Sequence, residues 1–194
     1  KAILRIRKAL GRMQQPFAIM VGDINTARKI AHISKKEEEV LKSYVRPILV
    51  VNKREETDNI ISKYVAPSLH NVGIMLPYTG LHYMLFDEND MLIMTSANMP
   101  GEPMIIDNKE AVEKLANKVD YILAHDRRIV QRCDDSVLRI VAGRRALIRR
   151  SRGFVPLPIK ISLRNNKNIL AFGGEINTSI CILSRDRAYL SQYI

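Results

Sequence analysis

Short apolar runs alternate along this chain with segments whose apolar residues recur at helical spacing. Because each run is short and is bounded by proline, glycine or polar residues, we expect these runs to form the strands of a sheet. The runs are residues 16–21, 46–51, 71–76, 91–94 and 121–125. The segments with helical spacing are residues 25–33, 35–44, 80–86 and 107–119. This alternation predicts an α/β (α+β) fold built on a mixed sheet.

The C-terminal part of the chain has strand signals that follow one another without helices. Residues 136–151 contain two apolar alternations around Gly143, which predicts a β-hairpin. Two further strand signals come after Pro158. This tail is too short for a core of its own, so it forms either an extra hairpin on the main sheet or the start of a second domain. The predicted domains are residues 1–158 and 159–194.

The composition is that of a globular protein with a strong positive charge. Apolar residues make up 46% of the 194 residues, and no apolar run approaches the roughly 18 residues of a membrane helix. The two cysteines are too few for a disulfide framework, which favours the reducing cytoplasm. The formal net charge of +11 suits nucleic acid, a nucleotide or another polyanion. Because the first residue is Lys1 and not Met, we expect an upstream segment to be missing.

The stretch Thr95–Asn98 places small polar side chains directly after an apolar run that is predicted to be a buried strand. Pro100 and Gly101 end that strand, and Asp107 opens the next helix as its N-cap. Hydroxyls, an amide and backbone N–H groups at such a point can hold a phosphate, a ribose or a carbonyl oxygen. On this motif alone, a turn whose Ser and Asn bond their own backbone is the simpler explanation.

Several other side chains have both a chemical and a structural interpretation. Arg149 and Arg150 are neighbours in a predicted strand, so at most one of them points into a shared site. The pair Asp134–Asp135 has the composition of a metal site, although orienting an arginine is the simpler role. His82 is interpreted equally well as a catalytic base and as a structural histidine. Cys133 is interpreted as a small buried residue.

Five motifs occur in a fixed order along the chain. They are RMQQPFAIM (12–20), MTSANMPGEPMIIDN (94–108), RCDDSV (132–137), IRRSRG (148–153) and LAFGGEINTSICIL (170–183). In this combination the chain resembles the HypF family, the carbamoyltransferases of nickel–iron hydrogenase maturation. It is similar to the YrdC-like domain of these proteins, followed by the first residues of their ATPase-like domain. The resemblance implies the YrdC-like fold, an open twisted mixed sheet flanked by helices, with a truncated second domain after it.

The resemblance also implies an activity, partners and site residues. The YrdC-like domain joins ATP to carbamate, which is derived from carbamoyl phosphate, giving carbamoyl-adenylate and pyrophosphate with Mg²⁺ as the usual cofactor. The full-length protein then carbamoylates HypE for cyanide-ligand synthesis. The nucleotide-binding residues implied are Arg12, Thr95, Ser96, Asn98, Arg149 and Arg152, and the catalytic residues are Arg150 and Ser136. Further candidate substrate contacts are His82, His125 and Asp126, and no residue is assigned to a metal.

Three positions depart from the pattern of the family. Leu10 stands where a lysine is usual two positions before Arg12, and Lys8 is the nearest replacement. Gly80 stands in the place of a proline, and Thr178 in the place of an asparagine.

Two other functions stay open. A YrdC/TsaC-type synthase, which makes threonylcarbamoyl-adenylate for tRNA modification, would share the fold and most of the pocket, but RCDDSV and LAFGGE argue against it. A non-catalytic RNA-binding module suits the charge of +11. It is not favoured, because the chain has no Trp and its 4 Phe and 7 Tyr do not cluster into a stacking platform.

Overall fold

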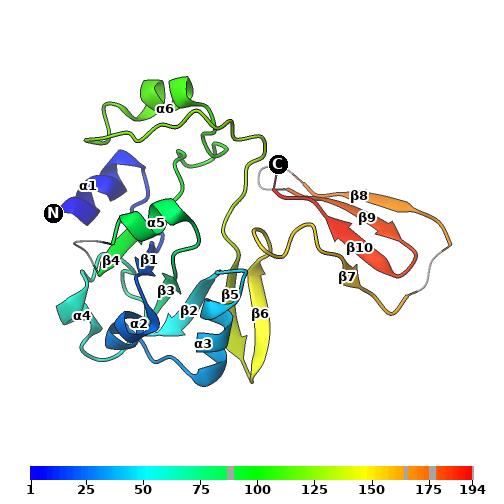
Figure 1. Cartoon of the computed structure of the whole chain (residues 1–194), viewed down its shortest axis with the longest axis horizontal. Coiled ribbons are helices and arrows are strands. Elements are labelled where there is room, and N and C mark those ends of the chain that lie inside the picture. The colour runs from blue at the N-terminus through cyan, green and yellow to red at the C-terminus, as the bar shows by residue number, and fades with distance from the viewer. Residues whose placement is uncertain (87–89, 164–165, 175–177, 194) are drawn as a thin grey trace. The chain divides into compact units, whose positions relative to one another are not determined.

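The chain divides into two compact units that interleave along the sequence (Figure 1). The computed structural model describes residues 1–86, 90–163, 166–174 and 178–193. The first unit consists of Lys1–Leu4, Met13–Thr95 and Asp135–Gly153, and the second of Arg5–Arg12, Ser96–Asp134 and Phe154–Ile194. These units do not follow the predicted domains 1–158 and 159–194, and that division stays a prediction.

The first unit is built on a six-stranded mixed sheet with the strand order β4-β1-β3-β2-β5-β6 (Figure 1). The strands are β1 (Ala18–Val21), β2 (Ile48–Asn52), β3 (Asn71–Met75), β4 (Met91–Met94), β5 (Val137–Val141) and β6 (Arg144–Arg149). The pairs β1–β3 and β2–β5 are parallel, and the other three pairs are antiparallel. The mixed sheet, its first four predicted strands and the hairpin at Gly143 are therefore confirmed.

Among its described residues, the first unit has four helices, three of which begin at a side-chain cap. The helices here are α2 (Ile24–Ile30), α3 (Lys35–Lys42), α4 (Thr57–Ile60) and α5 (Gly80–Met84). Of these, α2 contacts β1 and α3 contacts β2. The helix α3 begins with a capping box, because Ser34 Oγ accepts from the Glu37 N–H while the Glu37 carboxylate accepts from the Ser34 N–H.

The core lies between the central strands and these helices. Ile19, Leu49, Ile74 and Leu138, one from each of four strands, have no exposed surface. The prediction of a buried strand at residues 91–94 is wrong in one respect, because every residue of β4 is only half-buried. This follows from the position of β4 at the edge of the sheet, where only β1 pairs with it.

The second unit contains a separate four-stranded antiparallel sheet in the order β7-β10-β9-β8 (Figure 1). Its strands are β7 (Ile159–Lys160), β8 (Ile169–Phe172), β9 (Ile180–Ser184) and β10 (Arg187–Leu190). Of the two alternatives for the tail, an extra hairpin on the main sheet is therefore wrong. All four residues of β8 are exposed. Residues 175–177 of the GGEIN stretch lie outside the described residues.

Two helices complete the description. The helix α1 (Ala2–Ala9) opens the chain, and α6 (Asn108–Leu115) follows the polar loop. Asp107 caps α6, because its Oδ1 accepts from the N–H groups of Lys109 and Glu110. Among the described residues, every helix is too short or too polar to cross a membrane.

The strand predicted at residues 121–125 is wrong. These residues are irregular and exposed, with Tyr121 at 94% and Leu123 at 73% of their full accessible surface. A strand needs a hydrogen-bonded neighbour, and neither described sheet pairs with this segment. An apolar run of this length predicts a strand only where the topology supplies such a partner.

Candidate functional site

Arg12 joins the two polar residues of the loop that follows β4. Its Nη2 lies 3.1 Å from Ser96 Oγ, 3.1 Å from the carbonyl oxygen of Asn98 and 2.5 Å from Asn98 Oδ1. Ser96 Oγ also donates to Asn98 Oδ1 at 2.7 Å. All three residues are half-buried. We call this group the Arg12 cluster, and its role in nucleotide binding stays a prediction.

The polar loop is partly closed on itself, as the turn interpretation expects. Asn98 Nδ2 donates to the carbonyl oxygens of Met99 and Glu102, and the Ile105 N–H donates to the carbonyl oxygen of Ala97. The contact from Arg12, which is remote in sequence, goes beyond an ordinary turn. It places a guanidinium group where the loop leaves the strand end.

Arg7 contacts the backbone of Arg12 and was not among the predicted site residues. Its side chain is 1% exposed, and its Nη1 donates to the carbonyl oxygen of Arg12 at 2.6 Å. Burial lowers the pKa of both Arg7 and Arg12 because it disfavours the charged form. A signal for Arg7 existed in the sequence, since it lies at helical spacing before Leu10, which is buried directly after α1.

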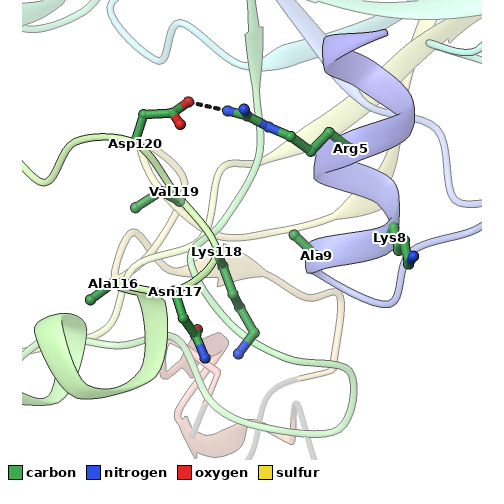
Figure 2. Close-up of a pocket in the computed structure, with 8 residues that line it drawn as sticks. All are labelled: Arg5, Lys8, Ala9, Ala116, Asn117, Lys118, Val119 and Asp120. Atoms are coloured by element: carbon green, nitrogen blue, oxygen red, sulfur yellow. Dashed lines mark hydrogen bonds and ion pairs between the residues drawn. The ribbon is translucent and has the colours of Figure 1, made fainter.

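Lys8 and Leu10 take different places in the structure. Leu10 is buried at 5% exposure, whereas Lys8 lines a pocket of about 500 Å³ between α1 and the segment after α6. Figure 2 shows Arg5 and Asp120 meeting as an ion pair in that pocket. Lys118 also lines it. Whether Lys8 replaces the lysine of the family stays a prediction.

Ser136 lies at the start of β5 and uses its hydroxyl group to hold another segment. Its side chain is fully buried, and its Oγ accepts from the Ser151 N–H at 2.8 Å and donates to the carbonyl oxygen of Arg152 at 2.9 Å. In this structure the hydroxyl therefore forms one hydrogen bond to the backbone of Ser151 and one to the backbone of Arg152. The catalytic role implied for Ser136 stays a prediction.

The three arginines of the IRRSRG motif have different surroundings. The strand β6 ends at Arg149, and a register shift interrupts its pairing near Val137, so the premise that Arg150 lies within a regular strand is wrong. Arg149 Nε donates to the carbonyl oxygen of Asp135 at 2.8 Å. Burial lowers the pKa of Arg150. The roles of all three at a phosphate stay predictions.

The guanidinium group of Arg152 contacts several residues of the first unit. Its Nη1 donates to Val45 O at 2.9 Å and its Nη2 to Arg46 O at 2.7 Å, while its Nε donates to Asp135 Oδ1 at 2.9 Å. Its guanidinium carbon also lies 3.5 Å from the centre of the Tyr78 ring. These contacts make Arg152 a structural tie between chain segments. The interpretation that one carboxylate of Asp134–Asp135 orients an arginine agrees with this geometry.

His82 stands beside this group. Its ring meets Tyr78 edge to face at 4.5 Å, and its Nδ1 is buried without a hydrogen-bond partner among the described residues. Burial lowers the pKa of His82, the Arg152 charge lowers it further, and the Asp135 carboxylate raises it. A histidine held neutral in this way suits both interpretations of His82, so its contact with substrate stays a prediction.

The remaining candidates lie in irregular segments. Thr95 is half-buried directly after β4, and His125 and Asp126 are exposed. His125 contributes its carbonyl oxygen to Asn108 Nδ2 at 2.7 Å. The interpretation of Cys133 as a buried residue is wrong, because it is exposed. Within the described parts of the chain, no cluster of three or more His, Cys, Asp or Glu side chains could hold a metal ion.

Comparison with known proteins gives a consistent result. The Sua5/YciO/YrdC family model, described as "Telomere recombination", matches residues 1–151. The probable carbamoyltransferase HypF of Methanocaldococcus jannaschii is 50% identical over 192 residues, which cover 99% of this chain and 25% of that protein. The chain thus spans about a quarter of the length of the curated relatives that it matches.

Solved structures agree with this result. The crystal structure of T. kodakarensis HypF matches with a TM-score of 0.92 and 46% identity, covering 100% of this chain and 25% of that one. A full-length HypF in the phosphate- and nucleotide-bound form matches with a TM-score of 0.91 and 38% identity, covering 100% and 30%. P. abyssi Sua5 complexed with L-threonine shares the fold, with a TM-score of 0.66 and 21% identity over 81% of this chain and 45% of that one. The resemblance to HypF is therefore confirmed.

Proposed function

The chain belongs to the Sua5/YciO/YrdC family, and on that premise we propose that it binds ATP and joins it to carbamate as part of a longer HypF-type carbamoyltransferase. Relatives named carbamoyltransferase HypF, at 36–50% identity over nearly the whole chain, support the carbamoyl chemistry. The nucleotide-bound state of one matching HypF supports a nucleotide as ligand. Transfer of the carbamoyl group to HypE belongs to the same proposal for the full-length protein.

The observation that carries the proposal is the Arg12 cluster. A half-buried guanidinium donates to Ser96 and Asn98 directly after a strand, so it is already oriented within the polar loop. A phosphate oxygen is the ligand that such a group prefers, because charge-assisted hydrogen bonds to arginine are strong and its fork fits phosphate geometry. The small side chains of the loop allow a ribose or a phosphate to approach the backbone closely.

The proposed reaction needs little from the protein beyond alignment and charge. A carboxylate oxygen of carbamate attacks the α-phosphorus of ATP, a new P–O bond forms, and the bond to pyrophosphate breaks. The nucleophile is carried by the substrate, so no side chain has to supply one. The residues of the site hold the two substrates in line and stabilise the charge that develops on the leaving group.

Mg²⁺ normally accompanies ATP in such reactions. The described residues include no cluster that fits a metal ion, so we assign no side chain to Mg²⁺ and route no step through it.

The degree of similarity favours carbamate over threonine as the co-substrate. Identity is 46% and 38% to the two HypF structures but 21% to Sua5, which matches at the level of the fold alone. RNA binding in place of catalysis has no such support.

Labelled pyrophosphate exchange into ATP tests this proposal. We expect exchange when carbamate is supplied as bicarbonate plus ammonia. Ser96→Ala with Asn98→Ala should weaken ATP binding at least tenfold, because it removes hydrogen bonds that each contribute about 1 kcal/mol, or about twice that to a charged oxygen. The matched control is Asn59→Ala with Ser62→Ala, two exposed positions of the first unit, which should leave ATP binding unchanged.

Two results would overturn the proposal in different ways. ATP affinity at the wild-type value in the Ser96→Ala/Asn98→Ala variant, measured by calorimetry, would remove the loop from the site. Exchange that depends on threonine and bicarbonate would assign the chain to tRNA modification.

A further inference from the structure

The segment Arg149–Arg152 is held at the residues on both sides of Arg150. Before it, Arg149 Nε donates to the carbonyl oxygen of Asp135. After it, the Ser151 N–H donates to Ser136 Oγ, and that hydroxyl donates to the carbonyl oxygen of Arg152. Both serines are fully buried, so the hydrogen bond between the Ser151 N–H and Ser136 Oγ is shielded from water.

We propose that Asp135 is a positioning residue that fixes this segment and thereby orients Arg150. The inference rests on the proposed function, because Arg150 is one of the catalytic residues that the resemblance implies. Asp135 acts at both ends of the segment. Its carbonyl oxygen accepts from Arg149 at 2.8 Å, and its Oδ1 accepts from Arg152 Nε at 2.9 Å and pairs with Nη2 at 2.8 Å.

The geometry explains why a carboxylate stands at this position. The Arg152 side chain is 20% exposed, and its other acceptors are the neutral carbonyl groups of Val45 and Arg46. A half-buried guanidinium is costly unless a charge compensates it, and Asp135 supplies that charge at hydrogen-bonding distance. Stacking against the Tyr78 ring then fixes the plane of the guanidinium group.

Ser136, the residue after Asp135, also holds this segment through its hydrogen bonds to Ser151 and Arg152. Because Asp135 and Ser136 are consecutive, one dipeptide directly before β5 contacts Arg149, Ser151 and Arg152, the residues on either side of Arg150. Alignment of a catalytic group depends on such support, since a displacement of about 1 Å can cost on the order of a hundredfold in rate.

The experiment compares Asp135→Ala, Asp135→Asn and the control Asp58→Asn in the full chain. Asp58 forms a surface ion pair with Lys53 in the same unit. We expect Asp135→Ala to weaken ATP binding about tenfold, Asp135→Asn to weaken it less because the amide oxygen still accepts from Arg152, and Asp58→Asn to leave it unchanged. The amide hydrogen of Ser151 should exchange faster in Asp135→Ala without any ATP present.

A double-mutant cycle distinguishes positioning from a general loss of stability. If Asp135 acts through Arg150, Asp135→Ala should change ATP binding less than about twofold in an Arg150→Ala background. An equal loss in both backgrounds would overturn the inference, as would wild-type affinity together with unchanged Ser151 exchange. Wild-type protein that does not bind ATP would overturn the proposed function, and the exchange of Ser151 would then decide alone whether Asp135 orders the segment.

Discussion

The two sheets of this protein contain similarly apolar strands, but they bury them very differently. In the six-stranded sheet, Leu49 and Ile74 have no exposed surface, whereas in the four-stranded sheet Leu170 is 55% and Phe172 is 70% exposed. The apolar pattern of a strand therefore does not predict how deeply the strand is buried. Burial requires a second layer, which α2 and α3 provide in the first unit.

The sharpest test of this difference is the same substitution in both sheets. Leu49→Ala should lower the free energy of unfolding by about 2–5 kcal/mol, because it leaves a cavity in a packed core. Leu170→Ala should change it by less than about 1 kcal/mol, because most of the side chain is already in contact with water. Urea unfolding of both variants measures the difference, and equal losses would show that β8 is buried in solution.

A second pair of substitutions compares two glycines with similar backbone angles. Gly153 in the first unit has φ +85°, and a Cβ there would lie 2.9 Å from the Cα of Val45. Gly101 in the second unit has φ +79° and open space around it. Gly101→Ala should cost only the backbone strain, about 1–2 kcal/mol, whereas Gly153→Ala should cost more because the Val45 backbone must move. Thermal unfolding checks the order, which a smaller loss for Gly153→Ala would contradict.

The smallest expected effect concerns His82 of the first unit. Because burial lowers the pKa of His82, the unfolded chain takes up a proton at a pH where the folded chain does not. Stability should therefore fall as the pH drops from about 6.5 through the folded-state pKa of His82. His82→Gln should flatten this decline in melting temperature between pH 7.5 and 5.5. An identical pH profile for wild type and His82→Gln would refute the expectation.

Much of the fold follows from local sequence signals. The N-cap at Asp107 and the hairpin turn at Gly143 are encoded within a few residues, and both form as expected. The strand prediction for residues 121–125 was wrong because the apolar residues of this segment give no information about which strand would pair with them. The edge position of β4 could not be predicted for the same reason, since strand order depends on contacts between distant residues.

The site is less predictable than the fold. Residue type and order are enough to suggest Arg12, Ser96 and Asn98, and the structure does bring these three together. Arg152 donates to Val45, Arg46 and Asp135, and the sequence does not predict these partners. An arginine that binds phosphate and an arginine that links chain segments have the same sequence pattern. The sequence indicates that Asp134 or Asp135 orients an arginine, but only the structure shows that the carboxylate is Asp135 and the arginine is Arg152.

The parallel pairing of β2 with β5 has a consequence for how the chain reaches this structure. Ile48 pairs with Val137, and everything between them, including the segment Ser96–Asp134 of the second unit, forms a loop that must close before this pairing is possible. Loop closure over such a distance is entropically unfavourable and slows folding. A protease cut within Ser96–Asp134 made after folding would leave β5 and β6 held to the sheet by noncovalent contacts. The two fragments would then be expected to copurify, and to reassemble after denaturation at a rate that depends on their concentration.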